Sequence, residues 1–315
     1  MRRFTSVHDV MNVNDILSSA LAYAEDPWLT PSLGHRKTLG LLFLNPSLRT
    51  RMSTQKAARL LGMDVIVLNA GSDAWTIETR DGVIMDGAAG EHMKEAAGVM
   101  GRYCDVLGLR TFPGLVDRAY DYAESVLESF IAYSGVPVVS LESATRHPLQ
   151  SFADLITIEQ HKTVQRPKVV LTWAAHPKAL PQAVPNSFVE WMKAANVDLV
   201  VAHPEGYELA PEFSDGVTVT HNQREALEGA HFVYAKNWSS YSSYGSILNT
   251  DPSWQITTES MARTDNGKFM HCLPVRRNVI VQDAVLDSDV SIVLDEAANR
   301  VVSAQTVLAA MLRAL

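Results

Sequence analysis

One serine, one threonine and two arginines stand close together at the start of an expected helix, in the order Ser47-Leu48-Arg49-Thr50-Arg51. An apolar, strand-like run, Lys37–Leu44, precedes them, and a segment of helical character, Met52–Leu61, follows. This order places Ser47 near a helix N-terminus, where backbone N–H groups are unpaired and the helix dipole is positive. The stretch therefore suits a phosphate. An ordinary capped helix start with solvated arginines would contain the same residue types.

Further polar residues follow other strand-like runs. Arg110 ends one run, the next leads into Glu142 and then His147-Pro148-Leu149-Gln150, and a third ends in His271-Cys272-Leu273-Pro274. Each group also has a structural explanation, as a surface ion pair, a satisfied histidine or a buried thiol. Their common position at strand ends is typical of ligand sites in parallel α/β sheets.

Strand-like and helix-like segments alternate along most of the chain, which predicts βαβ units around parallel sheets. We expect an α/β protein with two doubly wound domains, at residues 1–150 and 151–299, and a C-terminal helix at 300–315 that joins the first. The loop His176–Asn186 carries prolines at 177, 181 and 185 and should be stiff and extended. The expected strands are Lys37–Leu44, Val65–Asn69, Asp105–Arg110, Val136–Leu141, Val169–Trp173, Leu199–His203, Val217–Thr220, Phe232–Lys236, Lys268–Leu273 and Ser291–Leu294. The expected helices are Met52–Leu61, Glu91–Met100, Glu124–Tyr133, Pro148–Gln160, Ser187–Ala194, Gln223–Leu227 and Val301–Leu315.

The composition excludes several classes of function. A net charge of −8 argues against a nucleic-acid partner. Only two cysteines occur, Cys104 and Cys272, which argues against a disulfide framework and a cysteine-based zinc cluster. Neither a secretory signal nor a membrane-spanning run is evident, so the expected location is the cytoplasm. No Gly-rich phosphate loop occurs, which argues against a nucleotide-dependent dehydrogenase.

Three of these motifs together resemble the transcarbamylase family. They are the phosphate motif Ser47-Leu48-Arg49-Thr50-Arg51, the motif His147-Pro148-Leu149-Gln150 and the motif His271-Cys272-Leu273-Pro274, in the family's order and spacing. The resemblance implies carbamoyl transfer from carbamoyl phosphate to an amine, without a cofactor or a metal. It also implies a homotrimer with shared active sites and a knotted Pro-rich loop in the second domain.

The acceptor amine follows from a departure within the family. Ornithine transcarbamylases have a Ser-Met-Gly motif that this chain lacks, and Lys236-Asn237-Trp238-Ser239-Ser240-Tyr241 stands in its place. This is similar to the branch that acts on Nα-acylated ornithine in arginine biosynthesis. Ile280 stands where the acetyl type has a lysine, which favours the succinyl type, whereas Gly90 matches neither type. We therefore expect transfer to the δ-amine of N-succinylornithine, with acetylornithine or ornithine as alternatives.

The resemblance also implies a role for individual residues. Arg110, His147 and Thr50 would stabilise the oxyanion, Gln150 and the carbonyl groups of Cys272 and Leu273 would hold the carbamoyl amide, and Trp75 would come from a neighbouring subunit. Gly90 would affect acyl selectivity. The residues expected to bind carbamoyl phosphate are Ser47, Leu48, Arg49, Thr50, Trp75, Arg110, His147, Gln150, Cys272, Leu273 and Arg300, and those expected to bind the acylornithine are Glu142, His176, Lys236 and Arg276. A non-catalytic metabolite-binding regulator on the same scaffold would be expected to lose some of Arg49, Arg110, His147 and Gln150, and all four are present.

Overall fold

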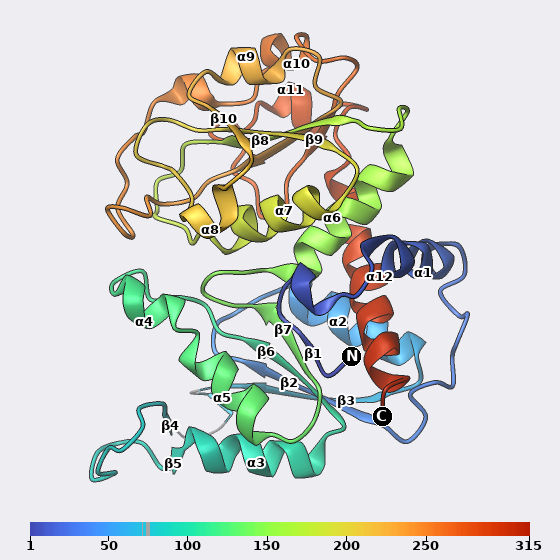
Figure 1. The fold of residues 1–315 in the computed structure, drawn as a ribbon, viewed down its shortest axis with the longest axis vertical. Coiled ribbons are helices and arrows are strands. Elements are labelled where there is room, and N and C mark those ends of the chain that lie inside the picture. The colour runs from blue at the N-terminus through green and yellow to red at the C-terminus, as the bar shows by residue number, and fades with distance from the viewer. Residues whose placement is uncertain (71, 74–75) are drawn as a thin grey trace. The chain divides into compact units, whose positions relative to one another are not determined.

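The computed structural model describes residues 1–70, 72–73 and 76–315, so Trp75 lies outside the described residues. The chain divides into two compact units (Figure 1). Unit 1 comprises Met1–Gly114, Ala119–Leu149 and Arg300–Leu315, and unit 2 comprises Leu115–Arg118 and Gln150–Asn299. Three helices, α4 (Arg118–Tyr122), α6 (Pro148–His161) and α12 (Val293–Leu312), contain residues of both units.

Unit 1 contains a parallel five-stranded sheet in the order β1-β7-β6-β2-β3 and a short parallel pair, β4-β5. Helices cover both faces of the larger sheet, with α3 and α5 on one face and α2 and α12 on the other (Figure 1). This arrangement confirms the predicted doubly wound fold. The strands are β1 (Arg3–Phe4), β2 (Thr38–Phe43), β3 (Asp64–Asn69), β4 (Ile77–Glu78), β5 (Glu91–His92), β6 (Val106–Arg110) and β7 (Val138–Glu142). The helices are η1 (Val7–Asp9), α1 (Val13–Glu25), α2 (Arg49–Leu60), α3 (Met93–Tyr103), α4 (Arg118–Tyr122) and α5 (Ser125–Tyr133).

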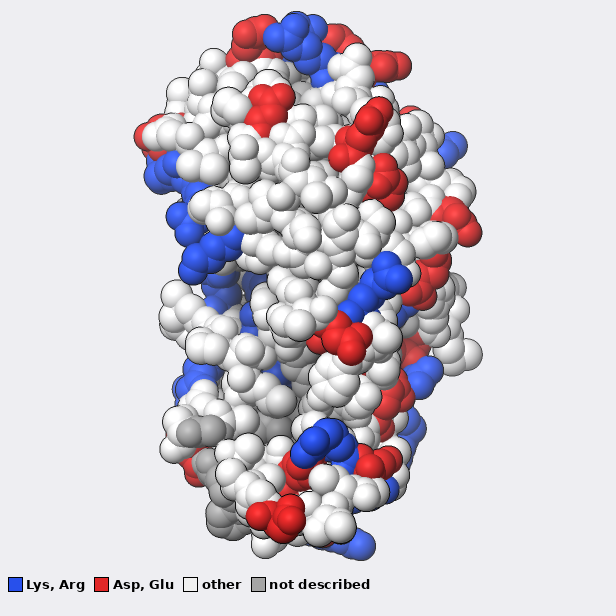
Figure 2. All heavy atoms as spheres, turned by 90° about the vertical axis from the view of Figure 1, so that its left-hand side faces the viewer, with Lys and Arg blue, Asp and Glu red and all other residues white. Residues whose placement is uncertain are grey.

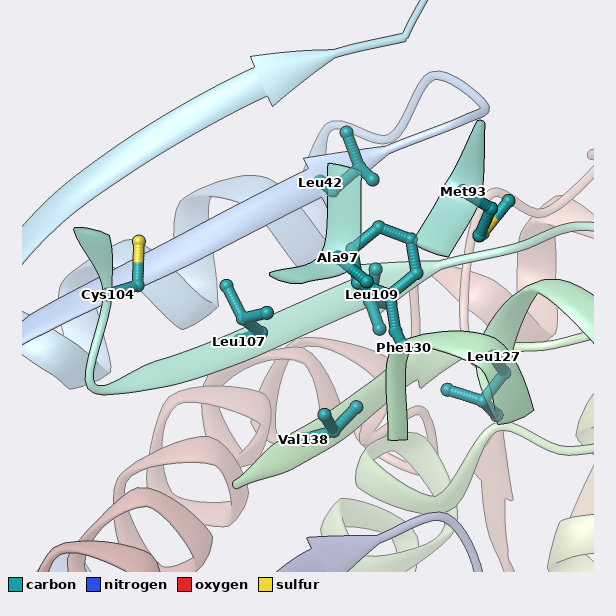
Figure 3. Close-up of a cluster of buried hydrophobic side chains, with 9 residues drawn as sticks. All are labelled: Leu42, Met93, Ala97, Cys104, Leu107, Leu109, Leu127, Phe130 and Val138. Carbon is teal, nitrogen blue, oxygen red and sulfur yellow. The ribbon is translucent and has the colours of Figure 1, made fainter. Parts of the chain in front are cut away.

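A cluster of buried apolar side chains joins α3 and α5 to one face of this sheet (Figure 3). Leu107 and Leu109 of β6 contribute to it from alternate positions, as the period of a strand requires. Phe130 of α5 is fully buried among them. Burying such side chains stabilises a fold by about 1.5–3 kcal/mol each, so this cluster fixes the helices against the strands that end in the polar residues discussed below.

Unit 2 repeats the architecture with a parallel sheet in the order β10-β9-β8-β11-β12. Its central strands β8 and β11 are buried nearly throughout, as expected when helices cover both faces. The strands are β8 (Lys168–Trp173), β9 (Asp198–Ala202), β10 (Thr218–Thr220), β11 (Phe232–Lys236) and β12 (Lys268–Met270). The helices besides α6 and α12 are α7 (Ala183–Ala194), α8 (Pro211–Ser214), α9 (Gln223–Leu227), η2 (Pro252–Trp254), α10 (Thr258–Met261) and α11 (Asp283–Leu286).

Two expectations about local structure were wrong. Ser291–Leu294 is not a strand: Ser291 forms a single bridge with Phe269, and α12 begins at Val293 because Asp295 and Glu296 favour a first helical turn. The Pro-rich loop is also shorter than expected. Its last residues are helical from Ala183, since Pro185 lies in the first turn of α7, where a missing N–H costs no hydrogen bond.

Among the residues that the structure describes, no helix combines the length and the apolar character needed to cross a bilayer.

Candidate active site

The loop between β2 and α2 carries the predicted phosphate motif. Leu48 occupies the N-cap position of α2 without a side-chain hydrogen bond to the helix, so the cap leaves first-turn N–H groups for another acceptor. The loop is anchored by Asn45, whose Oδ1 accepts a hydrogen bond of 3.0 Å from the Phe112 backbone N–H. It borders an open pocket of about 720 Å³ that Ser47 and Arg51 also line. This geometry suits an anion at the helix start, as the sequence predicted.

Arg300 contacts the same helix start from a distant part of the chain. Its Nη2 donates a hydrogen bond of 2.6 Å to Oγ1 of Thr50, and both residues are buried. Thr50 lies in the first turn of α2, so a permanent positive charge is held beside the helix N-terminus. Arg300 thus adds to the dipole of α2 in attracting an anion.

Three further predicted residues gather at the ends of β6 and β7. Arg110 and Glu142 are paired in register across these strands. The Arg110 guanidinium donates a hydrogen bond to the Glu142 carboxylate, and Nε2 of His147 lies 3.5 Å from the same carboxylate. Glu142 was expected to bind the acylornithine, yet in the structure it holds Arg110 and His147, which were expected to bind carbamoyl phosphate.

Gln150 lies in unit 2, within the first turn of α6. Its amide nitrogen donates hydrogen bonds of 2.8 Å to Asp154 and 3.0 Å to Glu296. Sequence reasoning missed both acidic partners. Asp154 could have been found, because it lies four residues after Gln150 on the same helix face. Glu296 is 146 positions away and gave no signal.

The His-Cys-Leu-Pro motif follows β12 in a tight turn. Leu273 has a positive φ of 56°, and a cis peptide bond joins it to Pro274. The Leu273 N–H donates to Nδ1 of His271 over 2.9 Å, while the neighbouring thiol of Cys272 is buried and not in a disulfide. The turn therefore fixes the backbone whose carbonyl groups were expected to bind the carbamoyl amide.

The predicted acylornithine residues of unit 2 form a cationic group. Arg276 Nε donates to Nε2 of His176 over 2.9 Å. Burial lowers the pKa of His176 most, and the positive charges of Arg276 and Lys236 lower it further. His176 therefore remains neutral at pH 7 beside two cations. On the face drawn in Figure 2, Lys and Arg side chains gather along the left-hand edge. The surface is therefore locally positive although the net charge of the chain is −8.

Four hydrogen bonds hold the segment that replaces Ser-Met-Gly, two with Ala174 just after β8 and two with the Pro-rich loop. Asn237 Nδ2 donates to the carbonyl of Ala174 over 2.7 Å, and the Ala174 N–H donates to the carbonyl of Lys236 over 3.1 Å. The Ser239 N–H donates to the Leu180 carbonyl over 2.8 Å, and Gln182 Nε2 donates to the Ser239 carbonyl over 3.1 Å. The backbone that presents Lys236 is thereby rigid.

The two positions used to judge the acyl group differ in their surroundings. Ile280 is 2% exposed and belongs to the core of unit 2. Gly90 is exposed, and its N–H donates to the carbonyl of Thr76 over 3.1 Å.

One group of potential metal ligands occurs among the described residues of the chain. Ligand atoms of His203, Glu208 and His221 all lie within 4.8 Å of one another. These residues do not belong to the predicted site.

Comparison with known proteins identifies the class. The carbamoyl-P binding domain of the aspartate/ornithine carbamoyltransferases matches residues 2–160, and their Asp/Orn binding domain matches residues 181–311. The chain belongs to the aspartate/ornithine carbamoyltransferase family, which confirms the prediction from its three motifs.

The sequence identity to individual members of the family differs with their substrate. The chain is 55% identical over 317 residues to N-succinylornithine carbamoyltransferase of Bacteroides thetaiotaomicron, with 100% of each chain covered. It is 38% identical over 296 residues to N-acetylornithine carbamoyltransferase of Xanthomonas axonopodis pv. citri, with 87% of this chain and 86% of that one covered. Among solved structures, acetylornithine transcarbamylase complexed with acetylcitrulline is 36% identical with a TM-score of 0.92, and 99% of each chain is covered.

Proposed function

We propose that the chain transfers the carbamoyl group of carbamoyl phosphate to the δ-amine of N2-succinyl-L-ornithine, giving N-succinylcitrulline and phosphate, as a step of arginine biosynthesis. The observation that carries the proposal is the set of polar side chains at three strand ends of unit 1. Thr50 with Arg300 follows β2, Arg110 ends β6, and Glu142 with His147 follows β7. The identity of 55% to a succinylornithine enzyme, against 38% to an acetylornithine enzyme, supports the succinyl group.

Most of the residues proposed to bind carbamoyl phosphate belong to unit 1, whereas Gln150, Cys272 and Leu273 belong to unit 2. The start of α2 would receive the phosphate through backbone N–H groups, and the Arg49 guanidinium would bind its oxygens as a fork. Arg300 would complete the anion site. The residues proposed to contact carbamoyl phosphate are Ser47, Leu48, Arg49, Thr50, Trp75, Arg110, His147, Gln150, Cys272, Leu273 and Arg300.

The reaction needs no covalent intermediate. The lone pair of the δ-amine attacks the carbamoyl carbon, the carbonyl oxygen becomes an oxyanion, and the bond to the phosphate oxygen then breaks while the amine loses a proton. Arg110, His147 and Thr50 would donate hydrogen bonds to the oxyanion, where a single preorganised donor is worth about 2.7–4 kcal/mol. Positioning the two substrates supplies much of the remaining acceleration.

Unit 2 would bind the acylornithine. Succinylornithine carries two carboxylates and acetylornithine only one, so a second carboxylate benefits more from the cations Lys236 and Arg276 beside His176. Glu142 remains a candidate for the amine end of the same substrate, because Arg110 could exchange the carboxylate for the oxyanion. Gly90 remains a candidate for acyl selectivity.

The proposed assembly is a homotrimer in the cytoplasm, with Trp75 completing the site of a neighbouring subunit. Exposed apolar side chains elsewhere in unit 1 support a subunit contact. Ile84 is 81% and Met85 is 42% exposed, and Leu48 at the phosphate loop is 68% exposed. The knot in the Pro-rich loop stays a prediction.

A side-by-side assay tests the acceptor. Carbamoyl phosphate is supplied with ornithine, acetylornithine or succinylornithine, and the citrulline-type product is measured. We expect kcat/KM to favour succinylornithine over acetylornithine by at least about tenfold, or about 1.4 kcal/mol of differential transition-state binding. Lys236→Met should narrow this ratio, whereas Lys162→Met, at a lysine paired with Glu159, should leave it unchanged. An equal or higher kcat/KM of the unmodified protein for acetylornithine would show that the assignment of the succinyl group is wrong.

A further inference from the structure

Three polar side chains in the interior of unit 2 contact one another. Gln150, Asp154 and Glu296 are each at most 1% exposed. Both bonds from the Gln150 amide nitrogen go to acidic oxygens, Oδ1 of Asp154 and Oε1 of Glu296. Asp154 offers no donor to a flipped amide when it is ionised, so the amide nitrogen must face the acids. The carbonyl oxygen of Gln150 is therefore directed to the opposite side.

The two acids also interact with each other. Both acids accept a hydrogen bond from the same Gln150 nitrogen, so two carboxyl groups lie close together in a fully buried site. Two ionised carboxylates there would repel each other, which favours one proton held by the pair. Burial raises the pKa of Glu296 well above its usual value, and the neighbouring Asp154 and Cys272 raise it further. The raised pKa favours the protonated form of Glu296, and its Oε2 accepts a hydrogen bond of 2.9 Å from the His271 N–H.

Two further titratable groups lie beside the pair. The Tyr234 hydroxyl is fully buried, and burial raises its pKa well above 10. Cys272 is buried and is not in a disulfide. The two N–H donors of Gln150 and the His271 backbone N–H compensate the negative charge that the acid pair retains.

We propose that Asp154 and Glu296, sharing one proton, are positioning residues that fix the Gln150 side chain with its carbonyl oxygen toward the substrate, where it accepts a hydrogen bond from the carbamoyl NH2. This inference rests on the proposed function, since it takes Gln150 to contact carbamoyl phosphate. It adds a basis for donor specificity. A fixed acceptor favours a group that bears an NH2 over an acyl phosphate with a methyl group at that position, because a methyl group offers no N–H donor.

Two substitutions at Asp154 separate positioning from packing. Asp154→Asn keeps Oδ1 as the acceptor for Gln150, and its amide N–H replaces the shared proton in the bond to an ionised Glu296. Asp154→Leu removes both interactions and keeps the branching of the side chain at Cγ. We expect Asp154→Asn to keep kcat/KM within about threefold of the unmodified protein, and Asp154→Leu to lose at least about thirtyfold.

Acetyl phosphate, which carries a methyl group in place of the NH2, is the probe of specificity. Its inhibition constant divided by the KM of carbamoyl phosphate should fall about tenfold or more in Asp154→Leu and should stay nearly constant in Asp154→Asn. Infrared difference spectra supply a readout that does not depend on activity or on the leucine variant. The unmodified protein at pH 7 should show the carbonyl band of a protonated carboxylic acid that is absent from Asp154→Asn.

The inference is overturned if that band is missing, or if both variants lose equal activity with unchanged discrimination against acetyl phosphate. Failure of the proposed function would look different, because the unmodified protein would then form no product from any ornithine derivative.

Discussion

Replacing Glu142 should lower the free energy of unfolding of unit 1 unless a bound anion supplies the missing negative charge. Its carboxylate binds Arg110 and lies 3.5 Å from His147, and the side chains of Arg110 and Glu142 are only 11% and 8% exposed. Arginine cannot lose its proton, so removing the carboxylate leaves a buried charge unpaired. Breaking such a pair costs about 3–5 kcal/mol, which we expect for Glu142→Leu. Glu142→Gln keeps a neutral acceptor and should cost less, about 1.5–3 kcal/mol.

The two units need not unfold together, so the measurement must report on unit 1 alone. Native-state hydrogen exchange of the amides in β6 and β7 gives the free energy of opening these strands. Inorganic phosphate supplies the missing negative charge, and at one hundred times its Kd it returns about 2.7 kcal/mol. We expect phosphate to bind Glu142→Gln more tightly than the unmodified protein, because Glu142 no longer competes for Arg110.

The control is Glu228→Gln, which breaks the exposed pair with Arg263 and should cost less than about 1 kcal/mol. Unchanged protection of β6 and β7 in both Glu142 variants would refute the argument, as would an equal effect of phosphate on the mutant and the unmodified protein.

Arg49→Ala should lower turnover by several orders of magnitude with the fold intact by circular dichroism, and near-normal activity would contradict its role at the phosphate. If Trp75 completes a neighbour's site, mixing inactive Trp75→Ala with inactive Arg49→Ala subunits should restore some activity, and no recovery after verified exchange would show that each site lies within one chain. The free energy of unfolding should fall as the pH drops from 6.5, the ordinary pKa of histidine, to below the lowered pKa of His176 in the folded protein. In this range the unfolded chain binds a proton at His176 and the folded chain does not. Equilibrium unfolding of His176→Gln should lack this loss, and an identical pH profile would argue against the lowered pKa.

Much of the fold could be predicted because both sheets are parallel and buried. Their strands, such as β8 and β11, are apolar runs, and they are easy to recognise because they alternate with helices. Ser291–Leu294 misled the prediction because a short apolar run fits a strand and the first turn of a buried helix equally well. The helix α1 was missed, although Asn12 caps it by accepting bonds from the N–H groups of Asn14 and Asp15.

Local motifs located the candidate site better than its internal contacts. The position of Thr50 beside a helix start followed from the neighbouring residue types, but its partner Arg300 lies 250 positions away. The contact of Glu142 with Arg110 was not predicted, since only the pairing of β6 with β7 brings the two residues together. Contacts between distant segments depend on sheet order and register, which a single sequence does not encode in a readable form.

The path of α12 has a consequence for how the protein is made. Unit 1 begins at the first residue but includes Arg300–Leu315, where Ser303 donates to the Leu149 carbonyl over 2.7 Å and Gln305 to the Pro27 carbonyl over 2.7 Å. At about 5–20 residues per second, the 250 residues between Thr50 and Arg300 take a ribosome roughly 12–50 s to add. Once unit 1 has been synthesised as far as Leu149, it exposes the surface that α12 later covers, while the strands of unit 2, which end with Met270, are added. A ribosome that stops within unit 2 therefore releases a chain whose phosphate site lacks Arg300 and whose uncovered apolar surface favours capture by chaperones and proteases.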